Sequence, residues 1–333
     1  GQVGGTVAVS VPGVSLQGTL SLEINTGAAS PVHQTIALGP DADATAAVVL
    51  GDVNGDGLVD VIVGNRGQVN VLYINDGEGD PFDSLTPLAI GAETDDTTSL
   101  ALADVDHDGD KDLVVGNDNQ ANRLYLNDGT GLLVLDASAD LGTAATTAVK
   151  LADIDGDGLA ELIVGINGSR NRLYLNQGNS DTTGVWQGFA AGADIGAEAD
   201  ATTSLAVGDV DGDGDLDLVV GNSGGTNRLY LNNAGALTLD NTGKLPADAS
   251  DTRALALGDV NGDGKLDLVA GNYNAANKLY LNNGGATWQG FAAATNITAD
   301  ADATTSVALG DVNGDGDLEI GRASCRERVF GYV

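Results

Sequence analysis

Short apolar runs, separated by clusters of Gly, Asn and Asp, recur along this chain in units of about fifty residues. Each unit opens with a run such as TTSLALADV, continues through an acidic loop to a run such as DLVVGN, and then reaches NRLYLN. A weaker fourth run is VWQGFAA from Val185 or TWQGFAA from Thr287. β-Branched and aliphatic residues between turn residues predict strands, and no helical stripe of useful length occurs.

Four strands per unit at this period predict an all-β fold, a β-propeller of four-stranded blades. The small residues of each first run fit an innermost strand beside a crowded channel. A tyrosine at the centre of each third run is expected to pack between blades (Tyr73, Tyr125, Tyr174, Tyr230 and Tyr280). The propeller is expected over residues 41–318, with repeats at about 41–92, 93–143, 144–198, 199–248, 249–300 and, cut short, 301–318.

Residues 1–40 lack the acidic loop but show strand patterning. We expect these strands to complete the blade that begins at Thr304, since closure removes exposed sheet edges. The alternatives are the end of a preceding domain or a strand lent to a neighbouring chain.

Residues 319–333 break the repeat with IGRASCRERV, which holds three arginines and the lone Cys325. This segment resembles the in-frame translation of a sequencing adapter fused to a gene fragment, and we interpret it as an artefact. The alternative is a short basic tail. On the first interpretation Leu318 is the last native residue, and Glu319 is doubtful.

The acidic loop carries oxygen-bearing side chains at positions 1, 3, 5 and 9, counted from its first Asp, and Gly at position 6. Hard oxygen donors without His or Cys suit Ca²⁺ better than Mg²⁺. The predicted side-chain ligands are Asp52, Asn54, Asp56 and Asp60; Asp104, Asp106, Asp108 and Asp112; Asp153, Asp155, Asp157 and Glu161; Asp209, Asp211, Asp213 and Asp217; Asp259, Asn261, Asp263 and Asp267; and Asp311, Asn313 and Asp315, with Glu319 set aside.

The backbone carbonyl at position 7 is the expected further ligand, at Leu58, Asp110, Leu159, Asp215, Lys265 and Asp317. A plain Asn-Gly or Asp-Gly hairpin turn is the simpler explanation, but it does not need so many carboxylates, which repel one another without a cation. We therefore expect about one Ca²⁺ per repeat, five or six in all. Position 12 is apolar, which disfavours a helix–loop–helix calcium hand.

The acidic excess narrows the class of partners. The chain has 48 Asp and Glu against 14 Lys and Arg, a net charge of −34, and half of the acidic residues lie in the loops. This charge argues against nucleic acid and anionic membranes, and no apolar run is long enough for membrane insertion. One Cys and two His offer no catalytic set, so we expect no enzyme activity.

The motif GDVNGDGxxD, followed by DLVVGN and RLYLN, resembles the FG-GAP/VCBS-type repeat, the family that includes the integrin α-subunit propeller. The resemblance covers residues 41–318. It implies a seven-bladed, calcium-binding propeller of extracellular proteins used for adhesion or ligand binding. This chain shows five full units and one cut short, so six blades are expected here.

Trp186 and Trp288 occur in matching segments. They either stack on sugar rings or are buried at a blade edge, and we favour burial.

The predicted function is a non-catalytic binding or adhesion module, extracellular or at the cell surface, with a protein or glycan ligand. The ligand is expected at the variable loops that follow the second runs, residues 67–69, 118–121, 168–170, 223–226 and 273–276. The alternatives are a structural subunit that contacts copies of itself in a filament or matrix polymer, and an accessory domain of a larger secreted enzyme.

Overall fold

The computed structural model describes residues 44–77, 87–180, 182–285, 287–299, 301–311 and 315–324. These residues form six antiparallel sheets and no helix. Residues 1–43 lie outside them, so the predicted closure by the N-terminal strands stays a prediction.

Five sheets have four strands each, in sequence order, and the sixth has two. The first two sheets consist of β1 (Thr45–Gly51), β2 (Asp60–Asn65), β3 (Asn70–Tyr73) and β4 (Leu88–Ile90), and of β5 (Thr97–Ala103), β6 (Asp112–Asn117), β7 (Arg123–Asn127) and β8 (Leu133–Leu135). The third and fourth consist of β9 (Thr146–Ala152), β10 (Glu161–Ile166), β11 (Arg172–Tyr174) and β12 (Ala193–Asp194), and of β13 (Thr202–Gly208), β14 (Asp217–Asn222), β15 (Arg228–Leu231) and β16 (Thr238–Leu239). The last two consist of β17 (Thr252–Gly258), β18 (Asp267–Asn272), β19 (Lys278–Tyr280) and β20 (Thr295–Asn296), and of β21 (Thr304–Gly310) and β22 (Glu319–Ser324).

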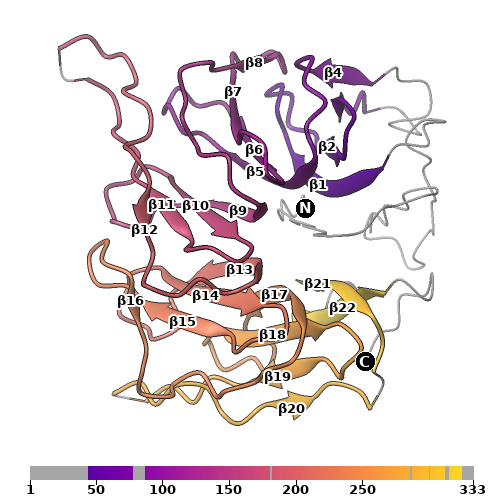
Figure 1. Cartoon of the computed structure of the whole chain (residues 1–333), viewed down its shortest axis with the longest axis vertical. Coiled ribbons are helices and arrows are strands. Elements are labelled where there is room, and N and C mark those ends of the chain that lie inside the picture. The colour runs from indigo at the N-terminus through magenta and orange to yellow at the C-terminus, as the bar shows by residue number, and fades with distance from the viewer. Residues whose placement is uncertain are drawn as a thin grey trace.

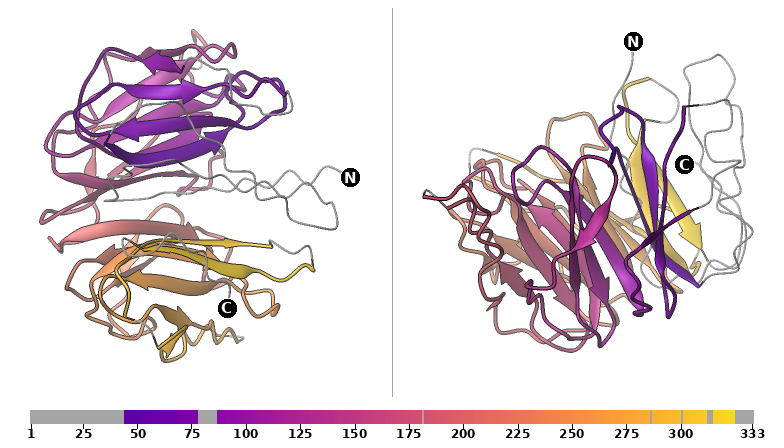
Figure 2. Two further views of the ribbon diagram at one scale, coloured as in Figure 1. Left: turned by 90° about the vertical axis from the view of Figure 1, so that its right-hand side faces the viewer. Right: turned by 90° about the horizontal axis from the view of Figure 1, so that it is seen from above.

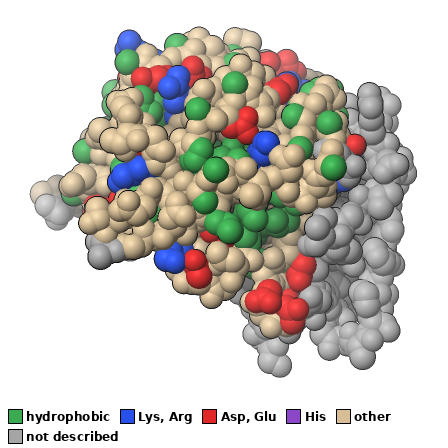
Figure 3. Space-filling model, turned by 90° about the horizontal axis from the view of Figure 1, so that it is seen from below, with side chains coloured by type: hydrophobic (Ala, Val, Ile, Leu, Met, Phe, Trp, Pro, Cys, Tyr) green, Lys and Arg blue, Asp and Glu red, His purple; other side chains and the backbone are tan. Residues whose placement is uncertain are grey.

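The sheets follow one another around a common axis, with the first strand of each nearest the centre and the fourth outermost (Figure 1). Their faces pack against one another, as the turned views in Figure 2 show. This is the predicted β-propeller of four-stranded blades, so the fold class is confirmed. The side of the molecule drawn in Figure 3 gathers hydrophobic side chains near its middle, with charged groups scattered around them.

Four of the five hydrophobic clusters lie between neighbouring blades, and the fifth covers one face of the first blade. Tyr125 of the second blade packs with Ile62 and Leu72 of the first, and the tyrosine hydroxyl donates to Glu93 at 3.1 Å. Tyr174, Tyr230 and Tyr280 pack against their preceding blades in the same way. The predicted inter-blade role is confirmed for these four tyrosines, whereas Tyr73 packs with Val48, Leu50 and Val61 of its own blade among the described residues.

The glycine near the end of each second strand exists because the next blade comes so close. A Cβ atom at Gly64 would lie 2.7 Å from the methyl group of Thr97, and one at Gly271 would lie 2.7 Å from Val307. Threonine hydroxyls bond across the same gap: Thr98 donates to the Thr146 carbonyl at 2.8 Å. Any side chain at these glycines would push neighbouring blades apart.

The predicted fourth strands at Val185 and Thr287 are wrong. The fourth strands β12 and β20 come later in the chain, and the Trp-containing segments instead fold back on the end of the third strand through isolated bridges. The physical reason is that Trp186 and Trp288 donate their indole N–H groups to asparagines at those strand ends.

The chain continues as a strand beyond Leu318. β22 pairs with β21 in the register of the other blades, with Glu319 opposite Gly310 as Asp267 is opposite Gly258. Residues 319–324 therefore have the geometry of a second strand, although they belong to the segment that the sequence pattern sets apart. Its origin as adapter sequence stays an interpretation, and residues 325–333 lie outside the described part.

Two of the threonines that begin the first strands have a hydroxyl without a hydrogen-bond partner among the described residues. Thr252 is buried, donates to Asn272 Oδ1 at 2.9 Å and accepts from Asn227 Nδ2 at 3.0 Å. The hydroxyl of Thr146, at the same place in the third blade, has no partner because Ile166 replaces the asparagine, and the hydroxyl of Thr304 in the sixth blade also lacks one.

We therefore expect Thr252→Val to lower the free energy of unfolding by about 1–3 kcal/mol, since it orphans buried polar groups. Thr146→Val should leave the free energy unchanged or raise it slightly, because a buried hydroxyl without a partner is lost. Chemical denaturation of both variants measures the difference. Equal losses would contradict this account of the threonine network.

Lys150 on β9 stands where the other blades carry Val or Ala, and burial lowers the pKa of its amine. Over the pH range between the folded and unfolded pKa values, the unfolded chain binds more protons, so stability rises with pH there.

We expect Lys150→Met to be more stable than the natural chain at pH 7, because burial disfavours the protonated amine of the folded chain, and this advantage to shrink towards pH 10. Thermal unfolding at the two pH values measures it, with Lys278→Met as the control for losing one positive charge. An advantage that grows with pH would refute the explanation.

Candidate metal centre

Each acidic loop connects the first strand of a blade to the second, so the loops share one end of the sheets. The chain can turn there because Gly at position 6 adopts positive φ, between 81° and 102° in the six loops. Position 4 of the first five loops also has positive φ, and His107 occupies it in the second loop with φ 61°. His107 is exposed.

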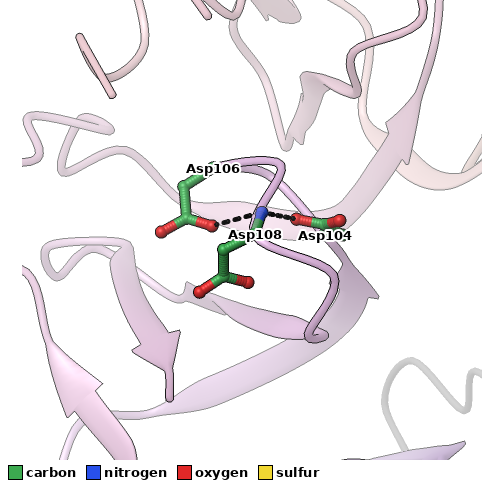
Figure 4. A group of neighbouring side chains, drawn as sticks. All are labelled: Asp104, Asp106 and Asp108. Atoms are coloured by element: carbon green, nitrogen blue, oxygen red, sulfur yellow. Dashed lines mark hydrogen bonds between the residues drawn. The ribbon is translucent and has the colours of Figure 1, made fainter. Parts of the chain in front are cut away.

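The backbone of each loop curls around its own acidic side chains. Asp108 donates its amide to Asp104 at 3.1 Å and to Asp106 at 3.3 Å, which brings the three carboxylates to one side of the loop (Figure 4). In all six loops the position 6 amide donates to the position 1 carboxylate, over 2.7–3.1 Å. Positions 1, 3 and 5 of the second loop therefore converge, and their role as metal ligands stays a prediction.

In each of three loops, one carboxylate oxygen from each of three residues lies within 4.8 Å of the other two. The groups are Asp104, Asp106 and Asp108; Asp153, Asp155 and Glu161; and Asp209, Asp211 and Asp217. A cation with oxygen ligands at about 2.3–2.6 Å spans such a distance between opposite ligands. The first and fifth loops have Asn at position 3, and Asn313 of the sixth lies outside the described residues.

Crowding of like charges changes the acidity of these loops. The pKa values of Asp106, Asp155 and Asp211 are raised, first by burial and then by the neighbouring Asp at position 5. A bound divalent cation would relieve that repulsion.

The position 9 carboxylate is the most enclosed group of the loop, with 0% exposure in Asp60, Asp112, Glu161, Asp217 and Asp267. Asp217 accepts the Val210 amide at 2.9 Å and the Asn232 amide at 2.8 Å, one on each oxygen. Burial raises the pKa of Asp112 and of Asp217 to about 6, although the two backbone amides that donate to each carboxylate lower it.

Position 7 varies. Its amide donates to the position 5 side chain, as from Leu58 to Asp56 at 2.8 Å. The side chain of Asp215 is turned away to the amide of Ala234, at 2.8 Å. Lys265 instead reaches back, with Nζ 2.9 Å from Asp263 Oδ2, and this bond lowers the pKa of Asp263. The carbonyl as a ligand stays a prediction at all six positions.

An asparagine at or just beyond the end of the third strand has a role that the sequence pattern did not predict. Asn127, Asn176, Asn232 and Asn282 are buried, and each donates its amide nitrogen to a carbonyl of the preceding blade's acidic loop at 2.7 Å. The signal was present, since every LYLN or LYIN run closes on this residue.

The two tryptophans donate hydrogen bonds to two of these asparagines. Trp288 is 7% exposed and donates its indole N–H to Asn282 Oδ1 at 2.7 Å, while Trp186 donates to Asn176 Oδ1 at 2.8 Å. Each ring meets a phenylalanine edge to face. The preferred interpretation, burial at a blade edge, is confirmed for Trp288, and Trp186 is half-buried.

These features define a class of protein: a β-propeller built from repeats with an acidic loop between the first and second strands. The FG-GAP-like repeat family matches residues 52–115, 104–164, 153–220, 209–270 and 259–321. The chain belongs to this family, as the resemblance predicted.

Solved structures agree at the level of the fold. The chain is similar to the computationally designed Ika8 protein, with 14% identity, TM-score 0.53 and coverage of 96% of this chain and 85% of that one. It is also similar to BBS1N crystallised in complex with ARL6DN, at 13% identity and TM-score 0.54, over 85% of this chain and 77% of that one. A search of curated proteins found no match.

Within the described ranges, no helix is long and apolar enough to cross a membrane.

Proposed function

We propose that this chain is an extracellular, calcium-loaded propeller that acts as a non-catalytic binding module. The observation that carries the proposal is the converging carboxylates of the acidic loops, in a geometry that repeats from blade to blade. The donor set is oxygen alone, which suits Ca²⁺. Positions 1, 3, 5 and 9 and the position 7 carbonyl would hold the ion, which would supply structural charge neutralisation.

The cellular location follows from the expected affinity. Extracellular calcium modules bind with dissociation constants of about 10⁻⁴–10⁻³ M, so they are loaded only where calcium is abundant. We infer that the protein works outside the cell or at its surface, in keeping with the resemblance to extracellular repeat proteins.

The partner surface is inferred from the loops at the other end of the sheets. Because adjacent strands are antiparallel, the connections between second and third strands lie opposite the acidic loops. They differ in every blade, for instance RGQV from Arg66 and SGGT from Ser223, while the asparagines that flank them recur. A constant scaffold with variable loops fits recognition of a protein or glycan.

The experiment that tests calcium loading is calorimetric unfolding with 10 mM calcium and with chelator. A ligand at 10 to 100 times its dissociation constant stabilises by about 1.4–2.7 kcal/mol per site, so several sites should raise Tm by on the order of 10 °C. Sodium chloride of matched ionic strength is the control, because salt also screens the net charge. An unchanged Tm would refute the proposal.

The fifth loop should bind calcium more weakly than the first and third loops. Lys265 pairs with Asp263, a predicted ligand, whereas the first and third loops carry Leu58 and Leu159 at that position. A fixed positive charge beside a cation site opposes binding.

Replacement Lys265→Leu should therefore tighten the weakest phase of a calorimetric calcium titration by about threefold to tenfold. Lys278→Ala, in β19 at the far end of the same blade, removes one lysine away from the loop and should leave that phase unchanged. If both variants shift it equally, the effect comes from overall charge and not from the ion pair.

The alternative to a protein or glycan ligand is another copy of this chain. Light scattering in calcium over a range of concentrations should give the mass of one chain. Growth into polymers would support the filament alternative.

A further inference from the structure

The asparagine at the end of each third strand joins two acidic loops. The side chain of Asn232 donates to the carbonyl of Ile154, which is position 2 of the preceding blade's loop, at 2.7 Å. The backbone amide of Asn232 donates to Asp217, position 9 of its own blade's loop, at 2.8 Å. One residue therefore contacts the acidic loops of two consecutive blades.

These contacts continue from blade to blade without a break. The Asp217 carboxylate accepts the amide of Val210 at 2.9 Å, and the carbonyl of Val210 accepts the side chain of Asn282 from the next blade at 2.7 Å. The same alternation runs backwards through Glu161 and Asp112 to Asp60. At the other end the backbone amide of Asn282 donates to Asp267 at 2.8 Å, so the contacts include five position 9 carboxylates and four asparagine side chains.

The orientation of the asparagine amide is fixed by chemistry. An indole N–H can only donate, so the Asn282 atom that faces Trp288 must be the oxygen, and Nδ2 must face the Val210 carbonyl. In the second and fourth blades the amides of Gly129 and Gly235 take the place of the indole. Each asparagine is also buried, so water offers no alternative partner.

We propose that Asn127, Asn176, Asn232 and Asn282 are positioning residues that couple the acidic loops, so that a cation bound in one loop raises the cation affinity of its neighbours. The proposal rests on the proposed function, because it takes the loops to be calcium sites. A cation that orders a loop fixes its position 2 peptide group and its position 9 carboxylate. Both groups take part in the hydrogen bonds that join consecutive loops, so the adjacent loop is already partly ordered when it binds its own cation.

The test is a calorimetric calcium titration of four chains: the natural chain, Asp155→Ala, which disables the third loop, Asn232→Ala, and the double variant. With Asn232 present, disabling the third loop should weaken the remaining sites by about 5-fold or more. With Ala at position 232 the same change should cost the remaining sites less, because only the link through Asn176 to the second loop remains. Asn233→Ala is the matched control, since Asn233 is the exposed neighbour of Asn232.

Hydrogen exchange of the natural chain keeps the test valid even if Asn232→Ala fails to fold. As calcium is added, the amides of Val105, Ile154 and Val210 should gain protection together, over one range of concentration. Protection that arises loop by loop at separate concentrations, or equal costs in the cycle, would overturn the coupling while leaving calcium binding intact. Absence of heat and of protection in the natural chain would instead overturn the proposed function and the coupling with it.

Discussion

The buried carboxylate at position 9 of the first five acidic loops is the group on which the rest of the structure depends. It lies at the start of a second strand, between the loop that it closes and the end of the third strand. A charged group so enclosed is costly unless its oxygens are bonded, and the two backbone amides that it accepts meet that need. Those amides come from separate segments, so satisfying one charge also fixes the loop and the third strand.

The same requirement explains how blades stay in register with one another. Position 2 of the loop donates its amide to the carboxylate and offers its carbonyl to the following blade, where an asparagine side chain takes it. Hydrophobic packing of tyrosine and aliphatic side chains closes the rest of the gap, and glycine in the second strand allows the close approach. Apolar contacts are tolerant of small shifts, whereas the polar bonds select one alignment.

Individual repeats depart from this pattern at single residues, and each departure changes one local property. Ile166 leaves the Thr146 hydroxyl without a partner, Lys150 places an amine where burial lowers its pKa, and Lys265 neutralises part of a predicted cation site. None of them disturbs the strands around it. Nearest-neighbour contacts in a repeat fold confine such effects to a blade and its immediate neighbours.

The sequence by itself determined the period, the three inner strands of each blade and the converging carboxylates, because alternation, turn residues and loop spacing are local properties. Only the tertiary structure decided where the fourth strands lie and what the tryptophans and terminal asparagines do. Asn127 and Val53 are separated by 74 residues, and Asn232 and Ile154 by 78, so their bonds exist only once neighbouring blades have packed. No local pattern in the chain encodes which carbonyl a buried amide will meet.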